Sequence, residues 1–217
     1  FIFLLIISSS IQANQEIYGR LDIAISNINK GKQSSKSEIK SHASRIGFKG
    51  SEIFDNGLSA IFQYELQNDP IDWDPAFKQR NSFVGIKGSY GTLFLGTHDT
   101  AMKRSISKID LFNDLAADIK NILQGENRMS DFIGYTTPTL GEGFSATFNA
   151  IKGTEEEGNS IGDSTSISLN YKTKSFYAAI AFDSELKGYD TTRISIQVPF
   201  NRTQIGIIYQ ATEKLSS

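Results

Sequence analysis

The chain has 217 residues, a net charge of −2 at pH 7 and a mean hydropathy of −0.27, so a helical membrane protein is not expected. A charge this close to zero gives no general reason to expect a nucleic-acid partner. The sequence contains no cysteine, which excludes a disulfide framework, a thiolate metal site and a cysteine nucleophile.

The N-terminal segment 1–13, FIFLLIISSSIQA, is apolar and then small and polar. Its apolar run is far shorter than the ~20 residues that a membrane-spanning helix needs. The pattern is typical of the second half of a secretory signal peptide with cleavage after Ala13. The missing Met and basic n-region indicate that the sequence starts inside a precursor. The alternative is a buried N-terminal strand. We expect residues 14–217 to form the exported domain.

From Asn14 onward, apolar and polar residues alternate with period two, which predicts β-strands whose two faces meet different environments. The first such segment runs from Ile17 to Ile25, and the clearest follows Leu58. About eleven segments are recognisable, and many reach nine residues or more. That length fits the ~9–11 residues of a tilted membrane strand better than the ~5–6 of a globular one. Alternation alone leaves open whether the apolar face meets a protein core or lipid.

The connections between these segments alternate in length. The short ones are residues 54–57, 89–91, 138–142, 172–174 and 199–201, and the longer ones are 28–37, 68–79, 99–128, 152–163 and 184–191. Successive connections of an up-and-down meander lie at opposite ends, so the short turns gather at one end and the long loops at the other. This sorting is expected of an outer-membrane barrel, whereas a soluble sandwich has no physical reason for it.

The longest connection, residues 99–128, interrupts the β pattern. Its apolar residues repeat at helical spacing: Leu111, Phe112, Leu115, Ile119, Ile122 and Leu123. We therefore expect a short helix, on which Asp110, Asp114 and Asp118 would share one face because they are four residues apart. One interpretation is an external helix with a solvated acidic face. The other is a loop folded into the barrel lumen, with its acids facing the channel.

Four segments resemble the general trimeric porins of Gram-negative bacteria, most closely the neisserial and β-proteobacterial branch. They are IYGRLD (17–22), SRIGFKGSEIFDNGLSAIFQYE (44–65), RNSFVGIKGSYGTLFLGT (80–97) and DFIGYTTPTLGEGFSATF (131–148), in the family's order and spacing. The resemblance is specific over residues 14–150 and consistent in pattern to about residue 211.

The resemblance implies an all-β fold: an antiparallel, up-and-down transmembrane β-barrel of usually about 16 strands, of which about 11 are present. Its long third loop would carry the short helix into the lumen. An odd number of strands in a meander leaves an open edge that lipid cannot satisfy, so we expect a chain truncated at both ends.

The resemblance also implies a bacterial outer-membrane channel for passive diffusion of ions and small hydrophilic solutes. Its expected partners are further copies in a homotrimer and outer-membrane lipid or lipopolysaccharide. In such a channel, acids on the third loop oppose bases on the wall, and the field across the lumen biases ion selectivity. The period-two register of the strands points the wall cations inward. The lumen is also the cheaper place for them, because a guanidinium facing lipid near the midplane would cost ~2–4 kcal/mol.

The predicted basic wall is Arg20, Arg45, Lys49, Arg80 and Arg128, and the predicted acidic loop is Asp110, Asp114, Asp118 and Glu126. In this register Arg80 points away from Phe83. Two departures from the family pattern affect the site. Thr97 stands where a basic residue is frequent, which reduces the positive charge of the wall, and the loop lacks a PEFGG-type turn.

No cofactor, metal site or enzyme activity is predicted. The sequence has no G-x-S-x-G motif, no H-E-x-x-H motif and no phosphate-binding loop. His42 and His98 are single and are expected at the surface or the rim. Two other function classes remain as alternatives. One is an exported soluble β-barrel or sandwich that binds a ligand, and the other is an enzyme on a membrane barrel, disfavoured because no nucleophile, base and acid set is visible.

Overall fold

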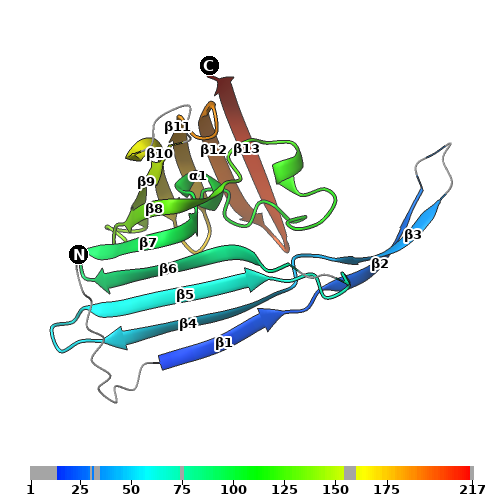
Figure 1. Ribbon diagram of the computed structural model, residues 1–217. Coiled ribbons are helices and arrows are strands. Elements are labelled where there is room, and N and C mark those ends of the chain that lie inside the picture. Colours follow the sequence, from blue (N-terminus) through cyan, green and yellow to red (C-terminus); the bar gives the residue numbers. More distant parts are fainter. Residues whose placement is uncertain (1–13, 30, 32–34, 74–75, 154–159, 216–217) are drawn as a thin grey trace.

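The computed structural model describes residues 14–29, 31, 35–73, 76–153 and 160–215 (Figure 1). The signal segment expected at residues 1–13 lies outside the described residues. The main feature is an 11-stranded sheet in which every strand is antiparallel to its neighbours. Its strands are β1 (Asn14–Arg20), β4 (Arg45–Ile53), β5 (Ser59–Gln67), β6 (Lys78–Gly88), β7 (Gly91–Asp99), β8 (Arg128–Thr136), β9 (Phe144–Lys152), β10 (Ile161–Lys172), β11 (Tyr177–Ser184), β12 (Tyr189–Phe200) and β13 (Thr203–Lys214).

The sheet follows chain order from β4 to β13, which confirms the predicted all-β, up-and-down meander. It curves along its width, and the long loop between β7 and β8 lies on its inner side (Figure 1). Within the part of the chain that the structure describes, β1 and β13 are the two edges and do not pair with each other.

The two faces of the sheet carry opposite kinds of side chain. On β10, Ser166 and Ser168 point inward and are buried, whereas Ile167 and Leu169 point outward and are 38% and 50% exposed. The same inversion holds along β12. Its buried inward residues are Thr191, Arg193, Ser195 and Gln197, and its exposed outward residues include Ile194 and Ile196. A soluble sandwich packs its apolar face inside. The apolar face of this sheet therefore meets lipid, which answers the question that alternation left open.

The connections largely follow the predicted sorting. Short ones span 54–58, 89–90, 137–143, 173–176 and 201–202, and the opposite end carries 21–44, 68–77, 100–127, 153–160 and 185–188. The last is the exception, because β12 already begins at Tyr189 and leaves four residues. The turn after Phe54 shows why the sequence bends there. Gly57 takes a positive φ of 78°, and the Asn56 side chain accepts the N–H of Leu58.

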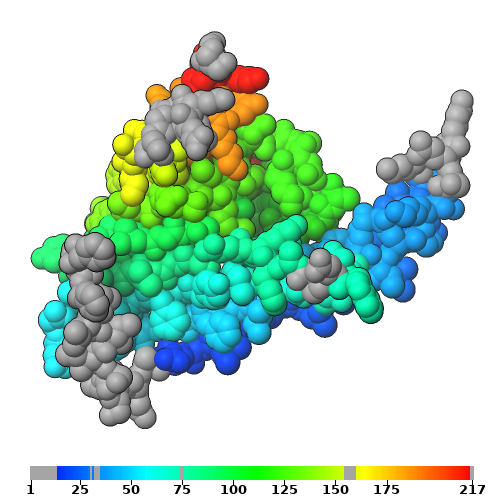
Figure 2. Space-filling model, in the orientation of Figure 1, coloured from blue at the N-terminus to red at the C-terminus, as the bar shows by residue number. Residues whose placement is uncertain are grey.

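A separate two-stranded sheet projects from the wall (Figures 1 and 2). It pairs β2 (Ile23–Ile28) with β3 (Lys36–Ser41), so the single strand predicted through Ile25 is wrong. The chain leaves the main sheet after Arg20, where local bonds replace the ladder. The N–H of Asp22 donates to the Ser44 hydroxyl, and the Asp22 carbonyl accepts the N–H of His42.

The long loop contains only α1 (Ala101–Arg104) and a 3-10 turn, Ile119–Asn121. The predicted short helix of the loop is therefore present as α1, but it does not include the apolar repeat from Leu111 to Leu123, and the predicted shared acidic face does not exist. The aspartates themselves form turns: Asp110 accepts the N–H of Phe112, and Asp118 accepts those of Asp114 and Lys120. Asp114 adopts a φ of 67°, which a helix does not allow. Among the described residues, no helix is long and apolar enough to cross a membrane.

Candidate functional site

The base of the long loop is fixed to the inner face of the wall. Met102 of α1 is fully buried, and its N–H donates to Ser166 Oγ of β10 at 3.0 Å. The neighbouring Ala101 N–H donates to Asn149 of β9 at 2.6 Å, and the Tyr177 hydroxyl of β11 donates to the Ser105 carbonyl at 2.8 Å. The loop therefore lies inside the curved wall, as the second of the two interpretations predicts, and is not an external helix.

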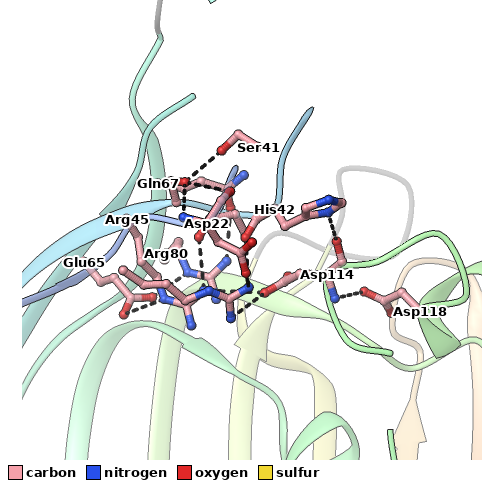
Figure 3. Close-up of polar contacts among 12 residues, drawn as sticks. Asp22, Ser41, His42, Arg45, Glu65, Gln67, Arg80, Asp114 and Asp118 are labelled. Atoms are coloured by element: carbon pink, nitrogen blue, oxygen red, sulfur yellow. Dashed lines mark hydrogen bonds and ion pairs between the residues drawn. The ribbon is translucent and has the colours of Figure 1, made fainter. Parts of the chain in front are cut away.

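The tip of the loop reaches the opposite part of the wall. Asp114 Oδ2 lies 3.5 Å from Arg45 Nη1 on β4 and 3.8 Å from Arg20 Nη1 at the end of β1. The Asp114 carbonyl also lies 3.1 Å from His42 Nδ1. Figure 3 shows Asp114 facing Arg45, with Glu65 on the far side of the guanidinium. The loop thus spans the inner side of the sheet from β9–β11 to β1 and β4.

A cavity of about 500 Å³ lies between the loop and the wall. The wall contributes Gln67, Arg80, Asp99 and Arg128 to its lining, and the connection between β1 and β4 contributes Ser41 and Ala43. The long loop contributes Lys103, Asn113, Asp114, Asp118, Lys120 and Glu126. All of these except Ala43 are polar or charged. Such a lining favours water and charged or dipolar solutes over apolar ones.

The wall carries a buried acid that the sequence prediction missed. Glu65 on β5 is 7% exposed, and its Oε1 lies 2.5 Å from Arg80 Nε. Its Oε2 lies 3.8 Å from Arg45 Nε and accepts the Tyr18 hydroxyl at 2.9 Å. The sequence did contain a signal for this position. Glu65 alternates with Tyr64 and Leu66, and a carboxylate in that phase faces inward together with the arginines.

A second acid sits at the loop junction. Asp99, the last residue of β7, lies 3.0 Å from Arg128 Nη2 and 3.1 Å from Lys103 Nζ. Asn81 connects the same groups, because its side chain donates to Asp99 and accepts from Arg128. The wall is therefore not a purely basic surface: its cations and acids alternate.

The predicted wall arginines lie in two charged clusters, but Lys49 lies in neither. Arg20, Arg45 and Arg80 surround Asp114 and Glu65, and Arg128 pairs with Asp99. Lys49 shares the inward face of β4 with Arg45 and lies toward the short-turn end. There its Nζ pairs with Glu16 at 3.1 Å and lies 5.1 Å from the ring centre of Tyr18. Period two directs the side chain correctly but does not give its height along the barrel axis. Lys49 therefore lies apart from the arginines that surround Asp114 and Glu65.

The four predicted loop acids have different surroundings. Asp114 alone forms ion pairs with the predicted wall cations. Asp110 is bonded to the backbone of its own loop, Asp118 pairs with Lys120 at 2.8 Å, and Glu126 pairs with Arg193 at 2.6 Å. Burial raises the pKa of Asp118, but hydrogen bonds from Lys120 and from the Asp114 N–H outweigh burial, and its pKa lies below the usual value. The loop is thus partly self-neutralised.

Arg80 and Phe83 lie on the same face of β6, contrary to the predicted opposition. Tyr64 pairs with Ser82 but Leu66 pairs with Gln79, so β6 has an extra residue in between. This bulge changes the phase of alternation. Phe83 lies opposite Gln63 and packs against Phe94 at 5.5 Å, while Arg80 still reaches the inward Glu65. In the described part of the chain, no group of three or more His, Cys, Asp or Glu could hold a metal ion.

Comparison with known proteins agrees with this architecture. The major outer membrane protein P.IB of Neisseria gonorrhoeae is 29% identical over 163 residues, covering 73% of this chain and 46% of that protein. The P.IB protein of Neisseria lactamica is 28% identical over 174 residues, covering 78% and 50%. The chain thus spans about half the length of the curated relatives it matches. These relatives confirm the predicted resemblance to neisserial porins.

A solved structure, the anion-selective porin from Comamonas acidovorans, has the same fold. It superposes with a TM-score of 0.77 at 21% identity, over 93% of this chain and 68% of that one. The family model described as Gram-negative porin matches residues 2–217. Because this match covers nearly the whole sequence, the chain belongs to the Gram-negative porin family.

Proposed function

We propose that the complete protein forms a water-filled channel through which ions and small hydrophilic solutes diffuse passively. Family membership and the exposed apolar outer face locate the protein in the bacterial outer membrane. The observation that carries the proposal is the cavity of about 500 Å³, lined by charges and enclosed between the loop and an inward-polar wall. A path of this kind lets an ion keep part of its hydration while it passes charged side chains.

The interleaving of charges suggests weak ion selectivity. Every predicted wall arginine that borders the loop has a carboxylate within 4 Å. The partners are Asp22 for Arg20, Glu65 and Asp114 for Arg45, Glu65 for Arg80, and Asp99 for Arg128. Paired charges attract or repel a passing ion less than isolated ones, and salt screens them further. The channel's selectivity is therefore set by small imbalances within the network.

The native assembly that we propose is a homotrimer, with lipid or lipopolysaccharide against the remaining outer surface. Support comes from family membership and from the breadth of the apolar outer face. That face includes Ile17, Val84, Ile86, Leu93, Leu95, Ile205 and Ile207, all at least 46% exposed. Sedimentation of the detergent-solubilised full-length protein tests the assembly. A protein–detergent complex containing a single chain would contradict it.

Reconstitution of the full-length protein in planar bilayers tests the channel itself. We expect stepwise, ATP-independent increases in conductance that scale with salt concentration. The alternative, a soluble ligand-binding barrel, predicts partition into buffer without detergent and no conductance. Protein that remains in the aqueous phase after mild extraction would overturn the channel proposal.

A further inference from the structure

One arginine of the inner wall is fully buried. Arg193, in the middle of β12, has no exposed surface and is the largest fully buried side chain among the described residues. Unlike Arg80 and Arg128, it does not line the cavity. A buried guanidinium is expensive unless all of its donors find acceptors, so its contacts indicate what it does.

The contacts of Arg193 join the two ends of the long loop. Its Nη1 donates to the Met102 carbonyl at 3.2 Å, where the loop begins, and to Glu126 Oε1 at 2.6 Å, where the loop ends. Its Nη2 donates to the Gln124 carbonyl at 2.7 Å. Two loop segments more than twenty residues apart are therefore held by one planar group.

Gln210, on the neighbouring strand β13, supports this arrangement. It accepts from Arg193 Nε at 2.8 Å and donates its own amide to the Gln124 carbonyl at 3.1 Å. Arg193 and Gln210 lie directly opposite each other in the β12–β13 pairing. The fork of the guanidinium is thus oriented by the sheet, and a lysine ammonium could not reproduce its geometry.

Gly125 provides an independent sign that the two ends are closely packed. It adopts a φ of 90°, and a Cβ added there would lie 2.7 Å from Met102 Cγ and 3.3 Å from Arg193 Nη2. Both the backbone conformation and the missing side chain are required at this point. The two ends of the loop are therefore packed too closely at this point to admit a side chain on residue 125.

We propose that Arg193 is a positioning residue for the long loop, and thereby for the constriction, by which we mean the narrow zone between Asp114 and the wall. By fixing both ends of the loop at one point of the wall, it keeps Asp114 against Arg45 and Arg20 and so sets the width and charge of the narrow zone. It does so without touching the permeating ion. The inference rests on the proposed channel function and adds a residue that controls the channel from behind the loop.

The test compares single-channel records of full-length Arg193→Met, Arg193→Lys and wild-type protein in planar bilayers. Arg193→Met should raise the frequency of brief closures and current fluctuations by about tenfold (about 1.4 kcal/mol), because several charge-assisted hydrogen bonds are lost. Arg193→Lys should give an intermediate rise, since it keeps the charge but loses the fork. If both variants close no more often than wild type and keep its reversal potential, the inference is overturned.

Two further variants separate positioning from a loss of folding. The double variant Arg193→Met/Glu126→Gln removes the unpaired buried carboxylate and should still show frequent closures. Gly125→Ala changes no charge and should produce the same closures by forcing the two ends apart. Strand content and the thermal transition of the barrel should stay near those of wild type. Variants that lose barrel stability in parallel with every change in closure would reduce Arg193 to a structural residue and overturn the inference.

Arg202→Met is the matched control, because Arg202 is exposed in the β12–β13 turn and the same charge is lost. It should behave as wild type, and equal effects in both arginine variants would contradict the proposal. The outcomes also separate the two levels of inference. A wild-type protein that does not conduct refutes the channel, whereas a conducting wild type with unchanged Arg193 variants refutes only the positioning role.

Discussion

Asp114 Oδ2 and Arg45 Nη1 lie 3.5 Å apart and join the tip of the long loop to strand β4 on the opposite wall. The Asp114 side chain is 12% exposed and that of Arg45 is 21% exposed, so the pair is shielded but still borders water. Arg20 approaches the same carboxylate oxygen at 3.8 Å. One acid of the loop thus faces two cations of the wall, at the border of the cavity between loop and wall.

Replacing Asp114 by Asn should shift selectivity toward anions. A unit charge about 7 Å from a hydrated ion changes its energy by about 0.6 kcal/mol in water, which corresponds to a two- to threefold change in the permeability ratio. The reversal potential in a salt gradient measures this ratio. Glu142→Gln is the control, because it removes an equal charge from the exposed turn between β8 and β9. An unchanged reversal potential for Asp114→Asn would remove Asp114 from the conducting path.

Glu65→Gln should also shift selectivity toward anions. Glu65 is close to both Arg45 and Arg80, so the variant removes a negative charge beside two cations of the wall. It should also lower the free energy of unfolding by about 1–3 kcal/mol, because a hydrogen bond to a charged group is lost. Tyr18→Phe removes the hydroxyl that donates to Glu65 but changes no charge, and it should leave the reversal potential unaltered. An unchanged reversal potential for Glu65→Gln would show that the charge of Glu65 does not act on ions in the lumen.

Strand positions could be predicted because period two follows directly from backbone geometry, and the lipid-facing side of β10 is correct from Ile167 to Leu169. The conformation of the long loop could not be predicted in this way. Its apolar spacing indicates a helix, whereas Asp110 and Asp118 accept backbone N–H groups and form turns. The role of Arg193 could not be predicted from the sequence for a different reason. Its partners are contributed by a segment far away in the sequence, and alternation gives direction without giving contacts.

The outer surface gives a prediction about the membrane. Val84 is 60% exposed in the middle of β6, with Ile86 beside it on the same face. Val84→Arg should destabilise the folded barrel in lipid bilayers by ~2–4 kcal/mol, the cost of a guanidinium that faces hydrocarbon near the midplane. Val84→Ala provides the control for lost volume and should cost much less. Equal folding of the two variants would mean that this face does not meet hydrocarbon.

Acid should loosen the tip of the loop only at low pH. The pKa of Asp118 lies below its usual value because hydrogen bonds from Lys120 and from the Asp114 N–H outweigh the opposing effect of burial. A carboxylate with a lowered folded-state pKa stabilises the fold fully above the unfolded-state pKa, ~3.9, and loses this contribution as the pH falls through the folded-state value. The difference in unfolding free energy between wild type and Asp118→Asn should therefore be constant from pH 7 to about pH 5 and shrink below about pH 4.

Equilibrium unfolding of the two proteins at a series of pH values measures this difference. Asp110→Asn is a useful comparison, because Asp110 accepts backbone N–H groups of the same loop but forms no ion pair with Lys120. If the wild-type advantage already disappears between pH 7 and pH 5, the Asp118 carboxylate is not held ionised by its neighbours. The turn that presents Asp114 to Arg45 must then be stabilised by other contacts, such as the bond between the Asp114 carbonyl and His42.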